Sequence, residues 1–465
     1  MANIGVLVFP QGVLNKLITS AIILNLFFLF TFESCKSPTA PKSYRLSLSV
    51  TDVSCTEAWI KLTMNNNTTL PANVEIKRNG NSIFSFNLTS RDTTVYDSTL
   101  LPNQTYTYQA KYDKGYPTEI SETITAKTMD TTSSNFTWQT TVFGDGFNNS
   151  FSDVEVVSDT SIWAVGLFSI QNSGTYNVAH WDGKKWNYYR LSAYNQQNVL
   201  EFIAPLTGVK VFSDTDMWFA DGNVYHWNGA GTILTAYWIG GYQGNPSPVL
   251  GPNQGISKLW GTSSNNLYGC GINGGLAYFD GIHWQQIQSG TTLNIQDIWG
   301  ANDPITGKEQ ILCMASNMFT PDGNAILEIT NNQAQIISNN GLTPYYFSSI
   351  WFKDSKIGYI GGSGDFKSYN FLTNPNWIAI WPKITPYYTN LVRGNDINDI
   401  VFCGSYGDIA HYNGIRWTDY LGNGLQNFYG ELTSISIKGN SVCAVGYGTF
   451  SSNIQAVIIL GRRGN

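Results

Sequence analysis

A short hairpin-like unit that returns along the chain constrains the fold more than any other feature of this sequence. Residues 178–186 read Val-Ala-His-Trp-Asp-Gly-Lys-Lys-Trp, and similar units follow at residues 224–229, 276–284 and 409–417. In each unit an alternating segment leads into Asp-Gly or Asn-Gly, which supplies the positive φ angles that a two-residue hairpin turn requires. Each copy therefore predicts a β-hairpin with a two-residue turn.

A second element precedes these hairpins and extends the repeat along the chain. Residues 158–166, Ser-Asp-Thr-Ser-Ile-Trp-Ala-Val-Gly, return as residues 213–220, and weaker matches continue to residue 446. The matching positions are about 42 to 55 residues apart, a spacing typical of propeller blades, and they are Trp163, Trp218, Tyr268, Leu312, Gly358, Val401 and Cys443. The sequence therefore predicts an all-β fold with a seven-bladed β-propeller over residues 136–465.

The two ends of this region are expected to meet. The final repeat runs through residues 455–460 but lacks the Trp strand that completes earlier repeats, whereas residues 136–141, Phe-Thr-Trp-Gln-Thr-Thr, form a strand that fits neither neighbour. Pairing of the two segments removes the unprotected edges of the first and last sheets. We therefore expect one sheet to contain residues near 138 and residues near 458.

The N-terminus has the pattern of an export signal. Lys16 precedes an apolar run over residues 17–32, and Cys35 follows a small residue, Ser34. This pattern is typical of a secretory signal, and a Cys directly after the cleavage point resembles the lipobox of bacterial lipoproteins, in which the thiol is diacylated. Phe32 and Glu33 depart from the usual lipobox residues. The resemblance implies a signal peptide over residues 1–34, lipidation of Cys35 and an outer-membrane or cell-surface location; a plain signal peptide of a secreted or periplasmic protein and an uncleaved anchor are the alternatives.

The segment between the signal and the repeats has a different β pattern. After a polar linker at residues 35–43, short alternating strands with frequent turns fill residues 44–128, which predicts an immunoglobulin-like β-sandwich. Residues 100–108, Leu-Leu-Pro-Asn-Gln-Thr-Tyr-Thr-Tyr, resemble the tyrosine corner of fibronectin type III domains, with Tyr106 as the corner residue. The resemblance implies a spacer or adhesion module, joined to the propeller by a linker over residues 129–135.

Composition limits the classes of partner. The net charge is −6, no basic run is present, and charged residues make up 12% of the chain, about half the usual share. Nucleic acid is therefore not an expected partner. No zinc-type cluster or cofactor motif occurs, so neither a metal nor a cofactor is expected. Four cysteines fall in the second strand of different repeats, where a thiol acts as a small buried apolar group: Cys270, Cys313, Cys403 and Cys443.

The repeats resemble bacterial extracellular propellers built from units of the form W-A-V-G … I-x-H-x-D-G-x-x-W, which are grouped loosely with Kelch and Asp-box propellers. The Asp-box match is incomplete, because Asp182 and Gly183 are adjacent and the Ser of that motif is missing. The sialidase activity associated with Asp boxes is therefore weakly supported.

Most conspicuous polar residues occupy repeat columns. His180, His226 and His411 share one column with Tyr278, and the Asp or Asn of each hairpin lies at a turn, so packing and turn formation explain them. Aromatic residues outside the columns are the candidates for ligand binding, because flat rings on loops suit sugar-binding surfaces. They are Tyr237, Trp238, Tyr242, Trp381, Tyr387 and Tyr388; burial between neighbouring blades is the alternative.

We therefore expect an exported, lipid-anchored protein whose propeller is a binding or scaffolding module for a glycan or protein ligand, without catalysis. No nucleophile elbow, zinc-protease motif, Walker loop or dinucleotide fingerprint is present. One alternative is a carbohydrate-active enzyme, a glycoside hydrolase or a glycosyl transferase-like protein. As a hydrolase it would show two carboxylates about 5 to 9.5 Å apart on the propeller face. A second alternative is an assembly factor that docks a membrane complex.

Overall fold

The computed structural model describes residues 45–66, 69–113, 119–144, 149–241, 247–302, 307–318, 323–354, 356–369, 371–372, 375–381, 384–450 and 453–464. The predicted signal peptide, Cys35, the linker at residues 35–43 and Tyr242 lie outside these ranges. The regular secondary structure of the described chain consists of β-strands and one short 3₁₀ turn, η1 (Ile272–Gly274). None of its described helical segments has the length and apolar character to span a membrane.

The first eight strands form two sheets. One sheet has the order β1-β2-β5, and the other has the order β4-β3-β6-β7 with β8 paired to β6. The bounds are β1 (Leu46–Val53), β2 (Ala58–Met64), β3 (Ala72–Arg78), β4 (Asn81–Leu88), β5 (Asp92–Asp97), β6 (Thr105–Asp113), β7 (Glu119–Ile120) and β8 (Ile124–Lys127). These strands follow the segments predicted for residues 44–128.

Two side chains, Tyr106 and Trp59, show how these sheets are held together. The Leu101 N–H donates to the Tyr106 hydroxyl at 2.8 Å, so Tyr106 makes the contact expected of a tyrosine corner. Ala58 and Ile60 of β2 are buried, and the alternation of a strand puts Trp59 on the opposite face. Trp59 is fully buried as well, because its own face is covered by groups that include Tyr96, whose ring lies 5.3 Å away. Both faces of β2 are therefore covered at this point.

From residue 150 the chain forms a series of sheets, each built on four antiparallel strands; these four strands follow chain order in every sheet except the last, whose outer strand is β9. The first three sheets contain β10 (Ser150–Ser158), β11 (Ser161–Ile170), β12 (Gly174–Trp181) and β13 (Trp186–Tyr189); β16 (Gly208–Ser213), β17 (Asp216–Ala220), β18 (Val224–Trp227) and β19 (Ile233–Tyr237); and β20 (Lys258–Ser263), β21 (Asn266–Cys270), β22 (Leu276–Phe279) and β23 (Trp284–Gln286). A hairpin of β14 (Ser192–Tyr194) and β15 (Leu200–Phe202) extends the second of these sheets beyond β19.

The remaining sheets have the same plan. They contain β24 (Ile295–Asn302), β25 (Glu309–Ser316), β26 (Asn324–Thr330) and β27 (Gln333–Ile337); β28 (Phe347–Phe352), β29 (Ile357–Gly362), β30 (Phe366–Tyr369) and β31 (Ile378–Ala379); β32 (Thr389–Asp396), β33 (Asp399–Gly404), β34 (Ile409–Tyr412) and β35 (Trp417–Asp419); and β36 (Tyr429–Lys438), β37 (Ser441–Phe450), β38 (Asn453–Arg463) and β9 (Phe136–Phe143).

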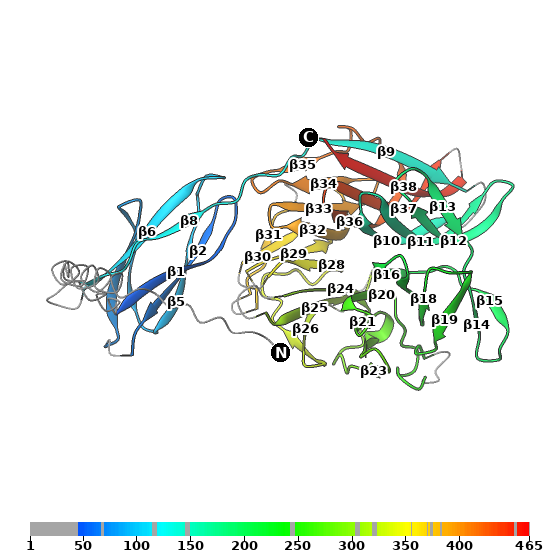
Figure 1. Cartoon of the computed structure of the whole chain (residues 1–465), viewed down its shortest axis with the longest axis horizontal. Helices are drawn as coiled ribbons and strands as arrows, with labels where there is room; N and C mark the ends of the chain where they lie inside the picture. The colour runs from blue at the N-terminus through cyan, green and yellow to red at the C-terminus, as the bar shows by residue number, and fades with distance from the viewer. Residues whose placement is uncertain are drawn as a thin grey trace, which may run out of the picture. The chain divides into compact units, whose positions relative to one another are not determined.

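The first strand of each of these sheets contacts the first strand of the next, and β36 contacts β10, so the sheets form a closed ring (Figure 1). We call these seven strands the inner strands: β10, β16, β20, β24, β28, β32 and β36. Apolar clusters fill the spaces between successive sheets, for example around Phe219 and around Phe402. This radial arrangement is that of a β-propeller.

The chain ends close the ring as expected. Strand β9 pairs antiparallel with β38, with Thr141 opposite Ile458 and Trp138 opposite Gly461 (Figure 1). The first strand after the linker therefore becomes the outer strand of the last sheet, and the prediction of a shared sheet for residues near 138 and 458 is confirmed.

The repeated hairpins form, but their turns are longer than predicted. Trp181 pairs with Trp186, which leaves four residues in the loop. The Asp182 carboxylate accepts the N–H groups of Lys184 and Lys185, each at 2.9 Å, and Gly183 has a φ of 90°. The Asp thus acts through its side chain, as in an Asx turn, and the prediction of a two-residue turn is wrong. The same bonds recur at Asp280 and Asn413.

Candidate functional site

The inner strands enclose a small polar cavity on the axis of the ring. Its volume is about 240 Å³. Because side chains alternate along a strand, two rows of residues spaced two apart line it. The first row includes Asp153, Lys258, Asp297, Leu391 and Ser434, and the second includes Glu155, Lys210, Trp260, Trp299, Arg393 and Ser436. Bulges immediately before Asp153, Asp297, Leu391 and Ser434 alter the register of those inner strands there.

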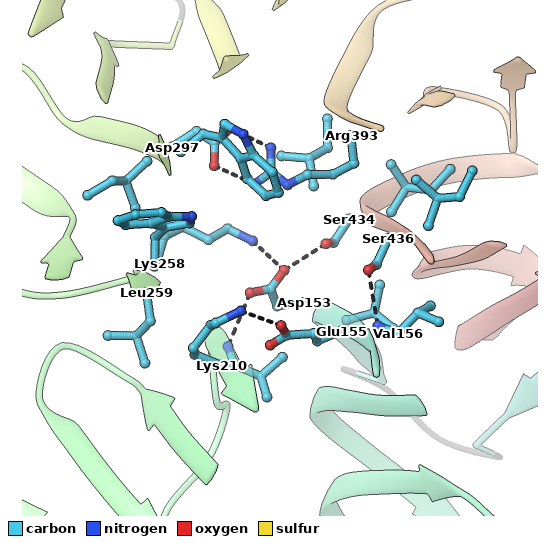
Figure 2. Close-up of a pocket in the computed structure, with 18 of the residues that line it drawn as sticks. Asp153, Glu155, Val156, Lys210, Lys258, Leu259, Asp297, Arg393, Ser434 and Ser436 are labelled. Carbon is cyan, nitrogen blue, oxygen red and sulfur yellow. Dashed lines mark hydrogen bonds and ion pairs between the residues drawn. The ribbon is translucent and has the colours of Figure 1, made fainter. Parts of the chain in front are cut away.

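Asp153 connects four inner strands through one carboxylate (Figure 2). Its Oδ1 accepts from Lys258 Nζ at 2.8 Å and from Ser434 Oγ at 2.7 Å, and its Oδ2 accepts from the Val209 backbone N–H at 3.1 Å. Asp153 lies on β10, and its partners lie on β20, β36 and β16. A carboxylate with three donors on three other strands is fixed in place.

Two further carboxylates, those of Glu155 and Asp297, make the same kinds of contact as Asp153. Glu155 pairs with Lys210 and accepts the Val211 N–H at 2.7 Å (Figure 2). Asp297, which has no exposed surface, receives Arg393 through both guanidinium nitrogens, at 2.7 and 2.9 Å, and accepts the Ile350 N–H at 3.0 Å. Each carboxylate therefore binds a cation from another sheet and a backbone N–H from the next inner strand.

These bonds explain why charged side chains line the cavity: the ion pairs join the inner strands to one another. The three carboxylates and the three cations that they bind balance in charge, and the carboxylates satisfy backbone groups where adjacent inner strands diverge. Burial by itself would lower the pKa of Arg393, but the adjacent Asp297 carboxylate outweighs it and raises that pKa. Its guanidinium therefore stays charged. Among the described residues that line the axial cavity, all three carboxylates are paired with cations.

A larger pocket adjoins the axial cavity and shares Lys258 and Leu391 with it. It has a volume of about 1000 Å³ and lies where the inner strands begin. We call it the channel mouth; its lining also includes Gln296, Met318, Tyr345, Tyr346, Ser348, Ser363, Tyr388, Asn390, Ser405, Glu431, Thr433 and Tyr447. Tyrosine rings, hydroxyl groups and amides thus dominate this surface.

The tyrosines of the mouth come from different sheets. The rings of Tyr346 and Tyr388 are nearly parallel, with centroids 5.8 Å apart and an interplanar angle of 14°. Tyr345 is 62% exposed beside them. Burial raises the pKa of both Tyr346 and Tyr388, so both phenols remain neutral hydrogen-bonding groups. Apart from Lys258, which is paired with Asp153, and Glu431, the described lining of the mouth presents flat rings together with uncharged donors and acceptors.

The mouth contains a single carboxylate among its described lining residues, Glu431. Ser405 Oγ lies 3.0 Å from both of its oxygens, and Asn390 Nδ2 donates to it at 2.9 Å. Hydrolysis of a glycosidic bond by the usual routes needs two carboxyl groups. The described lining of the mouth supplies one, and that one is already held by two neighbours.

The aromatic residues singled out from the sequence fall into separate places. Tyr237 stacks on Trp218 at 5.4 Å, and Trp238 packs edge-on against Tyr225 at 6.0 Å, so both rings contribute to packing. Trp381 is 47% exposed and is not among the lining residues of the mouth. Tyr388 lines the mouth, and the preceding Tyr387 contacts Tyr406 at 4.9 Å.

The histidine column is confirmed by the strand register, in which His180, His226 and His411 face Trp163, Trp218 and Val401 on the second strands. His411 is fully buried, with Nε2 2.8 Å from Asp399 and Nδ1 2.9 Å from Ser134. Burial lowers its pKa. Across the part of the chain that the structure describes, no three His, Cys, Asp or Glu side chains are grouped to hold a metal ion.

Sequence reasoning missed the axial charges. A partial signal is a charged residue at a bulge of an inner strand or two positions after it, as at Asp297 in Ile295-Gln-Asp-Ile-Trp299 and at Arg393 in Leu391-Val-Arg393. The repeat is clearest in the second and third strands of each unit, where the residues match best. The inner strands vary more in charge, because complementary charges on different sheets satisfy one another.

Comparison with known proteins concerns the fold alone. No family model matches the chain, and no curated protein matches its sequence. Solved structures that resemble it include the WD40 β-propeller domain of Doa1, at 13% identity and a TM-score of 0.45, covering 70% of this chain and 96% of that one. The C-terminal WD40 domain of Sif2 has 12% identity and a TM-score of 0.41, with coverage of 77% and 93%. An auxiliary nutrient-binding protein from Bacteroides ovatus has 11% identity and a TM-score of 0.34, with coverage of 92% and 100%.

Proposed function

We propose that this protein is a non-catalytic binding module whose channel mouth binds a saccharide. The observation that carries the proposal is the composition of the mouth, where Tyr345, Tyr346, Tyr388 and Tyr447 surround hydroxyl and amide side chains and one occupied carboxylate. Concave sites that bind small ligands combine aromatic walls with a few fixed polar groups. A sugar ring matches both, since its CH faces pack on a phenol ring and its hydroxyls bond to Ser, Asn and Tyr groups.

The proposal also assigns roles to the rest of the chain. The seven sheets whose inner strands form the ring are the blades of a seven-bladed propeller, and the two N-terminal sheets form a fibronectin type III-like spacer. Cys35 is the lipidated residue of a bacterial lipoprotein in the outer membrane or at the cell surface. The sequence at residues 16–35 and the contact between Leu101 and Tyr106 support these assignments.

Glycan-array screening of the purified full chain, followed by product analysis, tests the function. We expect retention of saccharides that bear no charge, with no release of new reducing ends during prolonged incubation. A Tyr388→Ala variant is expected to lose most of this retention, and Glu431→Gln to leave the absence of turnover unchanged. Release of reducing ends that Glu431→Gln abolishes would establish the carbohydrate-active enzyme instead. Failure to retain any saccharide would reject the proposal.

The anchor is tested separately. Substitution Cys35→Ser removes the only thiol that the lipobox-like segment offers for acylation, and two or more acyl chains are needed for stable attachment. The variant is expected to move from the membrane fraction to the soluble fraction. Unchanged membrane association would show that Cys35 is not the anchor.

A further inference from the structure

The backbone at Tyr406 is held in a conformation that bulky residues rarely adopt. Its φ is +63°, in the left-handed region that favours Gly, Asn and Asp. Two backbone bonds fix it there, from the Tyr406 N–H to the Gly430 oxygen at 2.8 Å and from the Phe428 N–H to the Tyr406 oxygen at 3.2 Å. Conformations of this kind are strained and concentrate at functional sites. The position thus holds a large aromatic residue at a cost in stability.

The strained backbone positions the Tyr406 ring between two other tyrosines. Tyr387 lies 4.9 Å away and Tyr429 lies 6.2 Å away, between ring centroids. Tyr406 is 40% exposed and Tyr429 is 75% exposed, so much of the aromatic surface of these two residues faces solvent and is not buried in the core. We call these three residues the tyrosine ridge.

A second hollow is lined in part by Tyr387, the residue that precedes Tyr388 of the mouth. It has a volume of about 710 Å³, and its described lining is uncharged: Tyr387, Leu421, Gly422, Gly424, Leu425, Gln426 and Asn427. The ridge is joined to the mouth by consecutive residues, since Tyr387 precedes Tyr388 and Tyr406 follows Ser405, and Tyr388 and Ser405 both line the mouth.

We infer that the tyrosine ridge and this second hollow form a further subsite, so that the ligand is a neutral oligosaccharide chain and not a single sugar. The inference rests on the proposed function. Successive sugar rings extending from the mouth would meet Tyr387, Tyr406 and Tyr429 in turn, and the uncharged hollow would accept hydroxyls through Gln426, Asn427 and backbone groups. An anionic chain would find no cation in the described lining of the hollow to compensate its charge.

Calorimetric titration of the full chain with an array-positive saccharide series of increasing length tests the inference. Affinity is expected to rise with chain length, by about two- to tenfold once the ridge is reached, the range for one aromatic contact. In Tyr406→Asn, which keeps a residue suited to positive φ, this gain should disappear while the affinity for the shortest ligands stays unchanged. Trp381→Ala, an exposed aromatic outside both hollows, should retain the gain.

The outcomes separate the two proposals. Binding of short saccharides with no gain on lengthening, or a gain that survives Tyr406→Asn, overturns the second subsite and leaves saccharide binding at the mouth intact. Absence of binding at every length overturns both. Extended peptides that bind with a loss in Tyr406→Asn, where saccharides fail, would assign the ridge to a protein ligand and reject the oligosaccharide.

Discussion

Asp297 and Arg393 form a bidentate ion pair at the axial cavity, with N–O distances of 2.7 and 2.9 Å. They lie on β24 and β32, which are not neighbours, because β28 lies between them in the ring. Asp297 also accepts the Ile350 N–H of β28, and the Arg393 guanidinium lies 4.9 Å from the Trp299 ring centroid. One buried carboxylate thus holds three consecutive sheets at fixed spacing.

Arg393→Met should strongly destabilise the ring. The substitution keeps the apolar stem but leaves the Asp297 carboxylate buried without a cation, and breaking such a pair costs about 3–5 kcal/mol. Urea unfolding monitored by tryptophan fluorescence measures the loss. Lys353→Ala is the control, since its pair with Asp396 is half exposed and worth at most about 1 kcal/mol. Equal small effects of both substitutions would contradict the structural role of Asp297.

Trp138 and Gly461 provide a test of ring closure by the two chain ends. A Cβ added at Gly461 would meet the Trp138 ring at 2.4 Å, so Gly461→Ala should cost about 1–3 kcal/mol through overpacking. In a Trp138→Ala background the indole side chain is absent, and Gly461→Ala should then reduce the unfolding free energy much less. A double-mutant cycle from unfolding free energies measures this coupling. Additive effects would contradict the pairing of β9 with β38.

Asp365 predicts a pH dependence of stability. Burial raises its pKa to about 7, with nearby Asp408 adding to the effect and Thr389 opposing it. Because the folded-state pKa exceeds the unfolded value of about 4, this group contributes most below pH 4, and its contribution falls as pH rises through 7. The total loss would reach about 4 kcal/mol.

Asp365→Asn should flatten the decline in unfolding free energy between pH 4 and 8 and stabilise the protein at pH 8. Asparagine suits the position, since Asn223 occupies the corresponding place before β18, where its side chain accepts the Gly240 N–H at 3.0 Å. Thermal unfolding at several pH values measures the profile for both proteins. Parallel profiles for the two proteins would show that Asp365 does not titrate in this range.

The buried thiols should be inert. All five cysteines of the described chain are free and buried, and burial raises the pKa of Cys55 to about 11 and those of Cys313, Cys403 and Cys443 further. Thiolate is the reactive form. In a Cys35→Ser background, Ellman's reagent should label almost no thiol in the native protein and five after denaturation. Rapid labelling of more than one thiol in the native protein would contradict the burial of the four cysteines on the second strands.

The hairpins, the repeat spacing and the ring closure could be predicted from the sequence, because they rest on local patterns such as Trp-Asp-Gly and on an unpaired strand at each end. The four-residue turn at Asp182 could not, because the choice between backbone and side-chain turn formation depends on how Lys184 and Lys185 bond to the carboxylate.

The candidate site was predicted only in part. Tyr387 and Tyr388 were found because they break the repeat, but Tyr237 breaks it too and packs on Trp218. The axial pairs, such as Asp153 with Lys258, join residues 105 positions apart. The strain at Tyr406 depends on bonds to Gly430 and Phe428. Both relations join segments that are distant in the chain, so a local pattern can mark a charged residue but cannot show which groups bind one another.

The most direct test of the account is calorimetric titration of a neutral saccharide into the wild-type full chain and into a Tyr346→Ala/Tyr388→Ala variant that retains wild-type unfolding stability. The two nearly parallel rings form the aromatic wall of the mouth, and loss of both should weaken binding by at least about tenfold, the equivalent of one to two aromatic contacts. Trp381→Ala should bind as the wild type does. Equal affinity of the wild-type protein and the double variant would contradict saccharide binding at the channel mouth.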